Sequence, residues 1–382
     1  MIYLDNAATT RVAPEVFEAM TPFLRDEYGN PSSVYALAGR AAAAMQEARR
    51  AVADFIGAEI DEIIFTGGGS EADNLAIKGI MSKHEGGHMI TSAIEHHAVL
   101  HTCEALESRG YDLSAVGVDE NGMVDPEEIR AAIREDTRII SIMHSNNEVG
   151  TLQPIAEISA IAREHDVLIH TDAVQSLGKV PLNVKELGVD LAAFSAHKLH
   201  GPKGVGVLYV RKGVRPQPLI HGGGQERRMR AGTENTAGIV GFGEAVKLAA
   251  QQGSEGIERM RSLRDRFIDG LMEAVPDVIL SGHPEKRLPN LASFLFKYIE
   301  GEGILLSLDM HQIAASSGSA CTSGSLDPSH VLLAMGYPHE VAHGSLRVSL
   351  SRYTTEEEID TVLEKLPPII GRLREMSPLV PG

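Results

Sequence analysis

The chain has 382 residues, 43% of them hydrophobic and 23% charged, which is typical of a globular enzyme with more than one domain. Its net charge of −17, without any block rich in lysine or arginine, argues against direct binding to nucleic acid. Because the chain has only two cysteines, no signal peptide and no apolar run of about 18 residues, we expect a cytoplasmic protein without a membrane span.

Apolar runs of strand length alternate with longer amphipathic stretches over the first part of the chain. Residues 62–66 predict a strand followed by a helix over 70–81, and residues 88–92 predict a strand followed by a helix over 96–110. Continuous apolar runs, which are typical of strands buried in a parallel sheet, follow at 137–145, 166–172, 190–196 and 204–210. This alternation predicts an α/β fold in which helices cover both faces of a largely parallel sheet.

After about residue 250 the pattern changes to helices mixed with short strands. The short strands are expected at 291–298, 313–320 and 345–352. We therefore expect a large domain over residues 13–255 and a smaller α+β domain formed by residues 1–12 and 256–382.

The first predicted strand ends in a glycine run. Ligands of open α/β sheets bind at the carboxyl ends of the strands, so the residues at these ends are the candidates for a site. Here Gly67-Gly68-Gly69-Ser70 leads into a helix, and the free backbone N–H groups of a helix start can bind an anion. A glycine turn before a helix is often only a turn, so this motif alone leaves both interpretations open.

The later strands end in acidic, amide and basic side chains: Asp172 with Gln175, the run 146–148, and His197 with Lys198. Asp172 could cap a following helix, or it could pair with the protonated ring nitrogen of a cofactor. A phosphate site, a lysine for covalent attachment and an acid at the ring nitrogen are the groups that pyridoxal 5′-phosphate requires. Neither a P-loop nor a Rossmann fingerprint is present at the expected place.

Longer motifs occur at each of these points. They include "YLDNAATT", "GNPSS", "EADNLAIKG", "NNEVGTLQPI", "HTDAVQSLGKVP", "SAHKLHGPKGVGVLYVR", "HGGGQERRMRAGTEN", "SSGSACTSGSLDPSH" and "SLRVSLSRYTTEEEID". Together they resemble the cysteine desulfurases of the NifS/IscS group, and the NifS branch most, over essentially the whole chain. That group belongs to the class V aminotransferase superfamily. The resemblance implies the fold type I architecture of enzymes dependent on pyridoxal 5′-phosphate: a large domain with a mostly parallel seven-stranded sheet, and a smaller α+β domain that carries a catalytic-cysteine loop.

The resemblance also assigns residues to the cofactor ring. It implies that Lys198 holds the cofactor covalently and moves the α-proton of the substrate. His96 is expected to stack on the pyridine ring and assist acid–base steps. Asp172 is expected at the pyridine nitrogen and Gln175 at the phenolic oxygen, with Asn147 near that oxygen and the substrate carboxylate.

Further residues are implied for the phosphate, the substrate and the sulfur. The phosphate is expected to contact Gly69, Ser70, Ser195 and His197, with Thr233 arriving from the other subunit of a homodimer. Arg347 is expected to bind the substrate carboxylate through its planar donors. Cys321 is expected to take sulfur from L-cysteine as a persulfide, leaving L-alanine. The loop around Cys321 would then deliver sulfur to an acceptor protein for iron–sulfur cluster assembly, including that of nitrogenase.

The phosphate segment departs from the usual motif. It reads "TGGGSEADN" where the family more often has "TSGATESDN", so that Gly67 and Gly69 replace larger residues and Ser70 replaces threonine. We expect the anion site to survive with a looser backbone.

Other activities remain open at this stage. A selenocysteine lyase, or a class V aminotransferase in which Cys321 is incidental, would share most of these residues. A protein without enzymatic activity is a third alternative, in which Cys321 ligates an iron–sulfur cluster and Lys198 is a relic.

Single residues also have simpler interpretations. His97 and His101 have the spacing of metal ligands, but the motif H-E-x-x-H is absent, so no metal site is expected. Cys103 is expected to pack in a core. Arg347 could form a structural ion pair instead of binding substrate.

Overall fold

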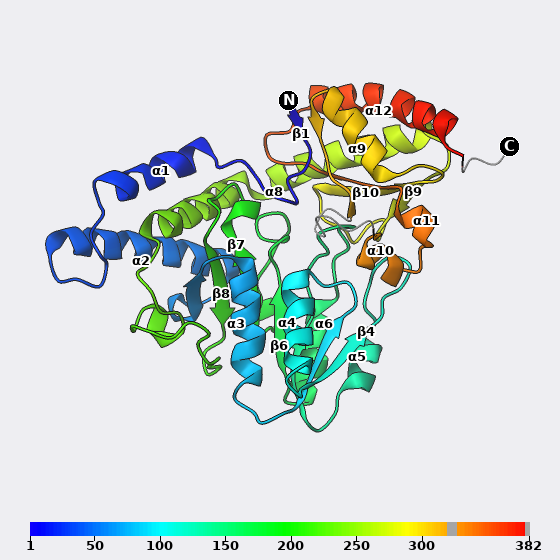
Figure 1. The fold of residues 1–382 in the computed structure, drawn as a ribbon. Helices are drawn as coiled ribbons and strands as arrows, with labels where there is room; N and C mark the ends of the chain where they lie inside the picture. The colour runs from blue at the N-terminus through cyan, green and yellow to red at the C-terminus, as the bar shows by residue number, and fades with distance from the viewer. Residues whose placement is uncertain (319–326, 379–382) are drawn as a thin grey trace.

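A seven-stranded sheet forms the centre of the larger part of the molecule (Figure 1). The computed structural model describes residues 1–318 and 327–378. The strand order is β2 (Ile63–Thr66), β8 (Gly206–Val210), β7 (Leu191–Ser195), β6 (Leu168–Asp172), β5 (Thr137–Ser141), β3 (His88–Ser92) and β4 (Asp112–Val116). Only β8 runs antiparallel to its neighbours among these strands, which confirms the predicted mostly parallel α/β sheet.

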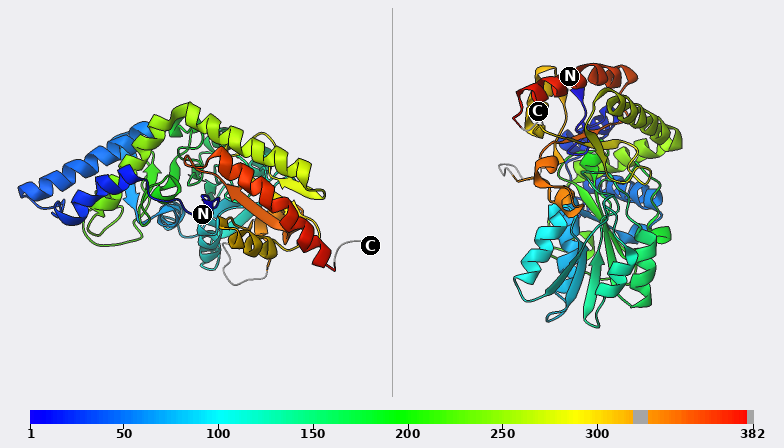
Figure 2. Two further views of the ribbon diagram at one scale, coloured as in Figure 1. Left: turned by 90° about the horizontal axis from the view of Figure 1, so that it is seen from above. Right: turned by 90° about the vertical axis from the view of Figure 1, so that its right-hand side faces the viewer.

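Helices cover both faces of this sheet (Figure 2). One face packs against α2 (Ala36–Ile56), α6 (Ile155–Glu164) and the first part of α8 (Thr236–Ala274), and the other against α3 (Gly69–Met81) and α4 (His97–Glu107). Alternate residues of a strand point to opposite faces. In β7, Ala192 and Phe194 therefore join the first core, whereas Leu191 and Ala193 join the second.

The shorter helices of this part are α1 (Pro14–Arg25), α5 (Pro126–Ala132) and α7 (Val184–Leu187). Three details differ from the sequence-based expectations. The chain leaves the sheet after Ser141, so β5 is shorter than the predicted strand, and α4 ends at Glu107 rather than Gly110. The apolar runs did not predict β4, because this edge strand is mostly exposed or half-buried and mixes polar with apolar residues.

A second core lies around a three-stranded antiparallel sheet in the order β12 (Ser345–Ser349), β10 (Leu291–Phe296) and β9 (Val278–Ser281). The helices of this part are α9 (Gly301–Met310), α10 (His330–Ala334), α11 (His339–Ala342) and α12 (Glu356–Met376). At the amino terminus, β1 (Ile2–Tyr3) pairs in parallel with β11 (Ile313–Ala314). The strand expected over 313–320 is therefore limited to β11 within the described residues.

Helix α8 contacts both cores. Leu248 and Ala249 belong to the core of the seven-stranded sheet, whereas Phe267 and Leu271 pack beside the three-stranded sheet. Between them Gly253 has φ 55° and ψ −159°, which interrupts the helix. The domain boundary predicted at residue 255 falls near this glycine and stays a prediction.

None of the helices within the described ranges combines the length and apolar character needed to cross a membrane.

Candidate active site

A cavity of about 270 Å³ lies at the carboxyl ends of the central strands. It is lined by most of the residues expected from the sequence: Gly69, Ser70, His96, Asn147, Asp172, Gln175, Ser195, His197, Lys198 and Arg347. Two expected residues are not part of this lining. Thr233 is exposed in the loop that precedes α8. Cys321 lies outside the described residues. Six separate segments of the chain thus contribute these residues to one cavity.

One end of the cavity has the character of an anion site. Gly68 precedes α3, and no side chain caps the first turn of this helix, so its N–H groups can face a ligand. A Cβ atom on Gly69 would lie 2.7 Å from Cγ2 of Val174, which explains glycine at that position. Ser195 and His197 border the same end from β7 and the turn that follows it.

Gly206 determines how closely β8 approaches the glycine turn, and sequence reasoning missed it. A Cβ atom at this residue of β8 would lie 2.5–2.7 Å from backbone atoms of Gly68. Only a residue without a side chain therefore lets β8 lie this close to the glycine turn.

Lys198 reaches from the end of β7 to the amino-terminal segment. Its Nζ donates to the carbonyl oxygens of Ala7 and Ala8 at 2.6 and 2.7 Å. The same Ala7 oxygen accepts the amide of Gln175 at 2.9 Å. Residues 7 and 8 thus line the cavity, a role that their small apolar side chains did not indicate.

Gln175 is fixed from the other side by a buried lysine. Lys179 Nζ donates to Oε1 of Gln175 at 3.2 Å, which orients the amide so that its nitrogen lies toward Ala7. Burial lowers the pKa of Lys179 to about 7, with the positive charges of Lys198 and Arg347 adding to this effect.

Asp172 ends β6 inside the cavity. Its Oδ1 accepts the N–H of Val174 at 2.9 Å, and the residues that follow form turns rather than a helix. The alternative that Asp172 caps a helix is therefore wrong. Burial raises the pKa of Asp172 to about 6, and the Val174 N–H and the Lys198 charge partly oppose this shift.

Two further buried acids accompany Asp172, and the sequence did not indicate either of them. Asp73 of α3 lines the cavity, and its Oδ1 lies 3.5 Å from Nε2 of His170, which shares a face of β6 with Asp172. Burial, with the charges of Asp172 and Glu95, raises the pKa of Asp73 well above its usual range. Burial also raises the pKa of Glu95 to about 8. These shifts favour the protonated, uncharged form of both acids.

His96 borders the cavity at the start of α4. Its Nδ1 accepts the N–H of Ala98 at 3.1 Å, so the ring caps the helix. Burial, helped by the charge of Lys198, lowers the pKa of His96 to about 4. The imidazole is therefore neutral at pH 7, and because Nδ1 accepts the Ala98 N–H, its proton is on Nε2.

The histidines behind His96 pack on one another. The ring centroid of His97 lies 4.7 Å from those of both His101 and His330. Within the described ranges, no group of three metal-ligating side chains is arranged to hold a metal ion. Cys103 is buried in the α3–α4 core, where burial raises the pKa of its thiol to about 12. The expectation that Cys103 is a packing residue is confirmed.

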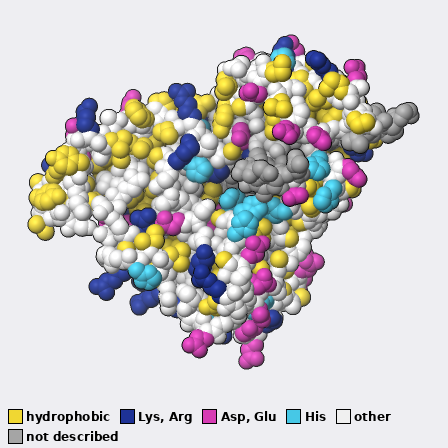
Figure 3. Space-filling model, viewed as in Figure 1, with side chains coloured by type: hydrophobic (Ala, Val, Ile, Leu, Met, Phe, Trp, Pro, Cys, Tyr) yellow, Lys and Arg dark blue, Asp and Glu magenta, His cyan; other side chains and the backbone are white. Residues whose placement is uncertain are grey.

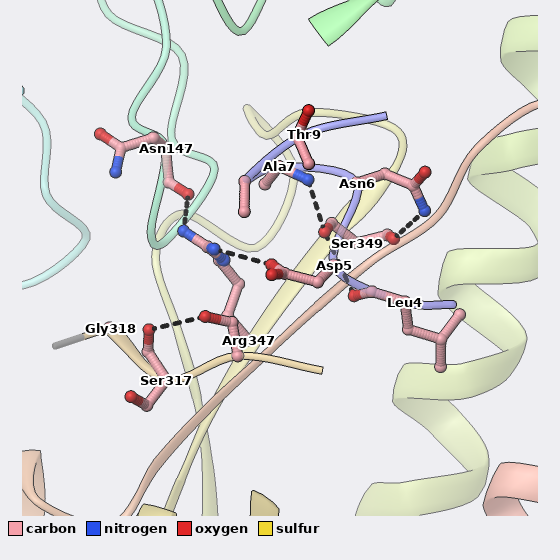
Figure 4. A network of polar contacts seen from close by, with 12 residues as sticks. Leu4, Asp5, Asn6, Ala7, Thr9, Asn147, Ser317, Gly318, Arg347 and Ser349 are labelled. Carbon is pink, nitrogen blue, oxygen red and sulfur yellow. Dashed lines mark hydrogen bonds and ion pairs between the residues drawn. The ribbon is translucent and has the colours of Figure 1, made fainter. Parts of the chain in front are cut away.

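Arg347 lines the cavity from the three-stranded sheet, and Figure 4 shows the residues around it. It projects from β12, with Nη1 donating to the backbone oxygen of Asn147 at 2.9 Å. Its Nη2 forms an ion pair with Oδ1 of Asp5, also at 2.9 Å. The structural ion pair considered from the sequence is therefore present, in a residue that also lines the cavity.

Comparison with known proteins places this geometry in a family. The model of the family "Aminotransferase class-V" matches residues 2–362. A cysteine desulfurase IscS of Methanosarcina thermophila is 54% identical, over 100% of this chain and 94% of that protein. A solved structure of a NifS-like protein is 41% identical, with a TM-score of 0.92 over 97% of this chain and 100% of that one. The structure of SspA in complex with cysteine is 38% identical, with a TM-score of 0.82 over 93% and 100%. The chain belongs to the class-V aminotransferase family.

Proposed function

We propose that the protein is a cysteine desulfurase, which converts L-cysteine to L-alanine and transfers the sulfur to Cys321, with pyridoxal 5′-phosphate as cofactor. One observation carries this proposal: a single cavity joins a lysine, a buried acid, an anion site and an arginine, in a chain similar to cysteine desulfurases over its full length.

The side chains in the cavity fit the cofactor. The start of α3, with Ser70, Ser195 and His197, offers N–H and hydroxyl donors to a phosphate. A side chain at Gly69 would fill part of this space. When bound, the cofactor withdraws electrons from the substrate Cα, so that bonds at this carbon and then at Cβ become labile.

The protein side chains would share the remaining work. Lys198 holds the cofactor covalently and carries the α-proton. Asp172 holds a proton at the ring nitrogen, a task for which a buried carboxyl that lines the cavity is suited. The neutral ring of His96 can donate the proton on Nε2 and take it back beside Lys198. Arg347 binds the substrate carboxylate, and the Cys321 thiolate attacks the sulfur.

We propose a homodimer in which Thr233 reaches the phosphate site of the partner. Thr233 is exposed and does not line the cavity of its own chain. Several large apolar side chains are exposed on and between α1 and α2, at the left of Figure 3: Phe17, Leu24, Tyr28, Val34 and Tyr35. An exposed apolar surface of this kind favours association with another protein surface. A monomer with full activity, seen by light scattering, would contradict the dimer.

We propose that the persulfide on Cys321 supplies iron–sulfur cluster assembly through an acceptor protein. A persulfide is discharged by transfer to another thiol, so a protein that forms one on each turnover requires an acceptor.

The variant Cys321→Ser tests the desulfurase activity, because it keeps the size and polarity of the side chain but removes the nucleophile. The variant should bind the cofactor and show absorbance changes with L-cysteine, yet release no catalytic sulfide or alanine. In the unaltered protein, mass spectrometry should find added sulfur on the peptide of Cys321 and not on that of Cys103. The matched control Cys103→Ala should keep its sulfide yield. An unchanged yield from Cys321→Ser would favour the aminotransferase alternative.

A further inference from the structure

The arginine end of the cavity is built by the amino-terminal segment as well as by β12. Arg347 is almost fully buried, and a buried guanidinium requires an opposing charge or a full set of acceptors. The Asp5 carboxylate provides the charge at Nη2, and the Asn147 oxygen accepts at Nη1. Within the described part of the chain, Nε of Arg347 is buried and has no hydrogen-bond partner.

Asp5 lies behind Arg347 as seen from the cavity. Arg347 contributes to the lining of the cavity, but Asp5 does not. The guanidinium has five N–H donors, and Asp5 and Asn147 each use one of them. Donors therefore remain for a second carboxylate that enters from the cavity, without displacing Asp5.

The position of Asp5 is fixed by a set of contacts to Ser349, two residues beyond Arg347 on β12 (Figure 4). Asp5 pairs with Ser349 in an isolated bridge. The side chain of Asn6 donates to the backbone oxygen of Ser349 at 2.8 Å, and the N–H of Ala7 donates to its hydroxyl at 2.8 Å. In return, the N–H of Ser349 donates to the oxygen of Leu4 at 2.7 Å. The carboxylate and the guanidinium are therefore held on one rigid unit.

We propose that Asp5 is a positioning residue for recognition of the substrate carboxylate: it turns the fork of Arg347 toward the cavity and compensates its charge when no substrate is bound. A planar guanidinium binds a carboxylate well only in a matching orientation, so loss of the partner that sets the orientation weakens binding. The inference rests on the proposed function, because it concerns the same substrate.

The variant Asp5→Asn tests the proposal with two ligands that differ only by a carboxylate, L-cysteine and cysteamine. The dissociation constant of each is measured from the absorbance of the cofactor-loaded protein. We expect Asp5→Asn to weaken the binding of L-cysteine by about 10-fold, which is the scale of one charge-assisted hydrogen bond. The dissociation constant of cysteamine should stay unchanged. KM for L-cysteine should rise while kcat changes little. Asp5→Glu, which keeps the charge, should restore part of the preference.

Three controls make the outcome decisive. Arg347→Met should abolish the preference for L-cysteine over cysteamine, and adding Asp5→Asn to it should cause no further loss. Asp360→Asn, which removes an exposed partner of Arg266, should leave both constants unchanged. If Arg347→Met keeps the preference, the proposed role of Arg347 is wrong. If Arg347→Met loses the preference for L-cysteine but Asp5→Asn keeps it, the positioning role is wrong. The same holds if Asp5→Asn weakens the binding of both ligands equally. Tighter binding of L-cysteine would mean that Asp5 competes with the substrate.

Discussion

The two ends of the cavity contain the same kind of group, a carboxyl, in opposite surroundings. At the ring end, Asp172, Asp73 and Glu95 are buried close to one another, and burial raises the pKa of each. At the arginine end, Asp5 is partly exposed and is paired directly with a guanidinium at 2.9 Å. Burial thus favours the protonated form of the acids at the ring end, whereas Asp5 directly contacts a cation.

This difference suits the two tasks that we propose. Acids with a raised pKa lie where the ring nitrogen of the cofactor must stay protonated. A fixed carboxylate lies where a guanidinium must be kept oriented without losing its attraction for a substrate. Lys198 links the two ends, because its Nζ contacts the segment that carries Asp5 and its charge opposes the pKa shift of Asp172.

The largest expected effect comes from removing that link. Lys198→Ala should bind the cofactor only non-covalently and reduce turnover by about 1,000-fold or more, because both covalent attachment and proton transfer are lost. Turnover assays, together with the loss of borohydride-reducible yellow absorbance, check this. Lys203→Ala, which changes an exposed lysine of the same loop, should behave as the unaltered protein. Normal turnover of L-cysteine by Lys198→Ala would overturn the assignment.

The same substitution at two neighbouring acids should give different losses. Asp172→Asn keeps the oxygen that accepts the Val174 N–H but cannot hold the ring proton, so kcat should fall by about 100-fold or more. Burial and the neighbouring acids raise the pKa of Asp73 well above its usual range, which favours its uncharged form, so Asp73→Asn should change kcat by less than about 3-fold. Steady-state kinetics on the folded, cofactor-loaded variants measure the two values of kcat. Equal losses would show that both acids act charged.

The smallest effect concerns stability without cofactor. The unfolded chain releases the Glu95 proton near 4.5, whereas the folded chain keeps it up to about 8. The folded state therefore binds more protons in that window, and the contribution of Glu95 to stability falls as the pH rises. Between about pH 5 and 8, Glu95→Gln should gain about 3–4 kcal/mol of stability relative to the unaltered apoprotein. Urea unfolding at both pH values measures this difference, and parallel pH profiles would contradict it.

Only one of the three acids at the ring end was predicted from the sequence. Asp172 was found because it ends a continuous apolar run, and such a run predicts a buried strand whose end lies at the ligand edge. Asp73 and Glu95 were missed because each lies among polar residues that are compatible with an exposed helix or loop. Only the packing of α3 against β6 and β7 makes Asp73 a buried acid.

At the arginine end, the sequence-based assignment of Arg347 rested on resemblance, and Asp5 received no role at all. The two residues are 342 positions apart, and no local periodicity relates them. Their pairing depends on the bridge between the amino-terminal segment and β12.

The sequence by itself predicted six of the seven strands of the large sheet, helices α3 and α4, the glycine turn before α3 and the lysine after β7, because these depend on neighbouring residues and their periodicity. Tertiary structure alone decided which acids have a raised pKa, why Gly206 must be glycine, and which carboxylate contacts Arg347. These properties depend on burial and on distances between segments remote in the chain, and burial is created only when the sheets and helices pack together.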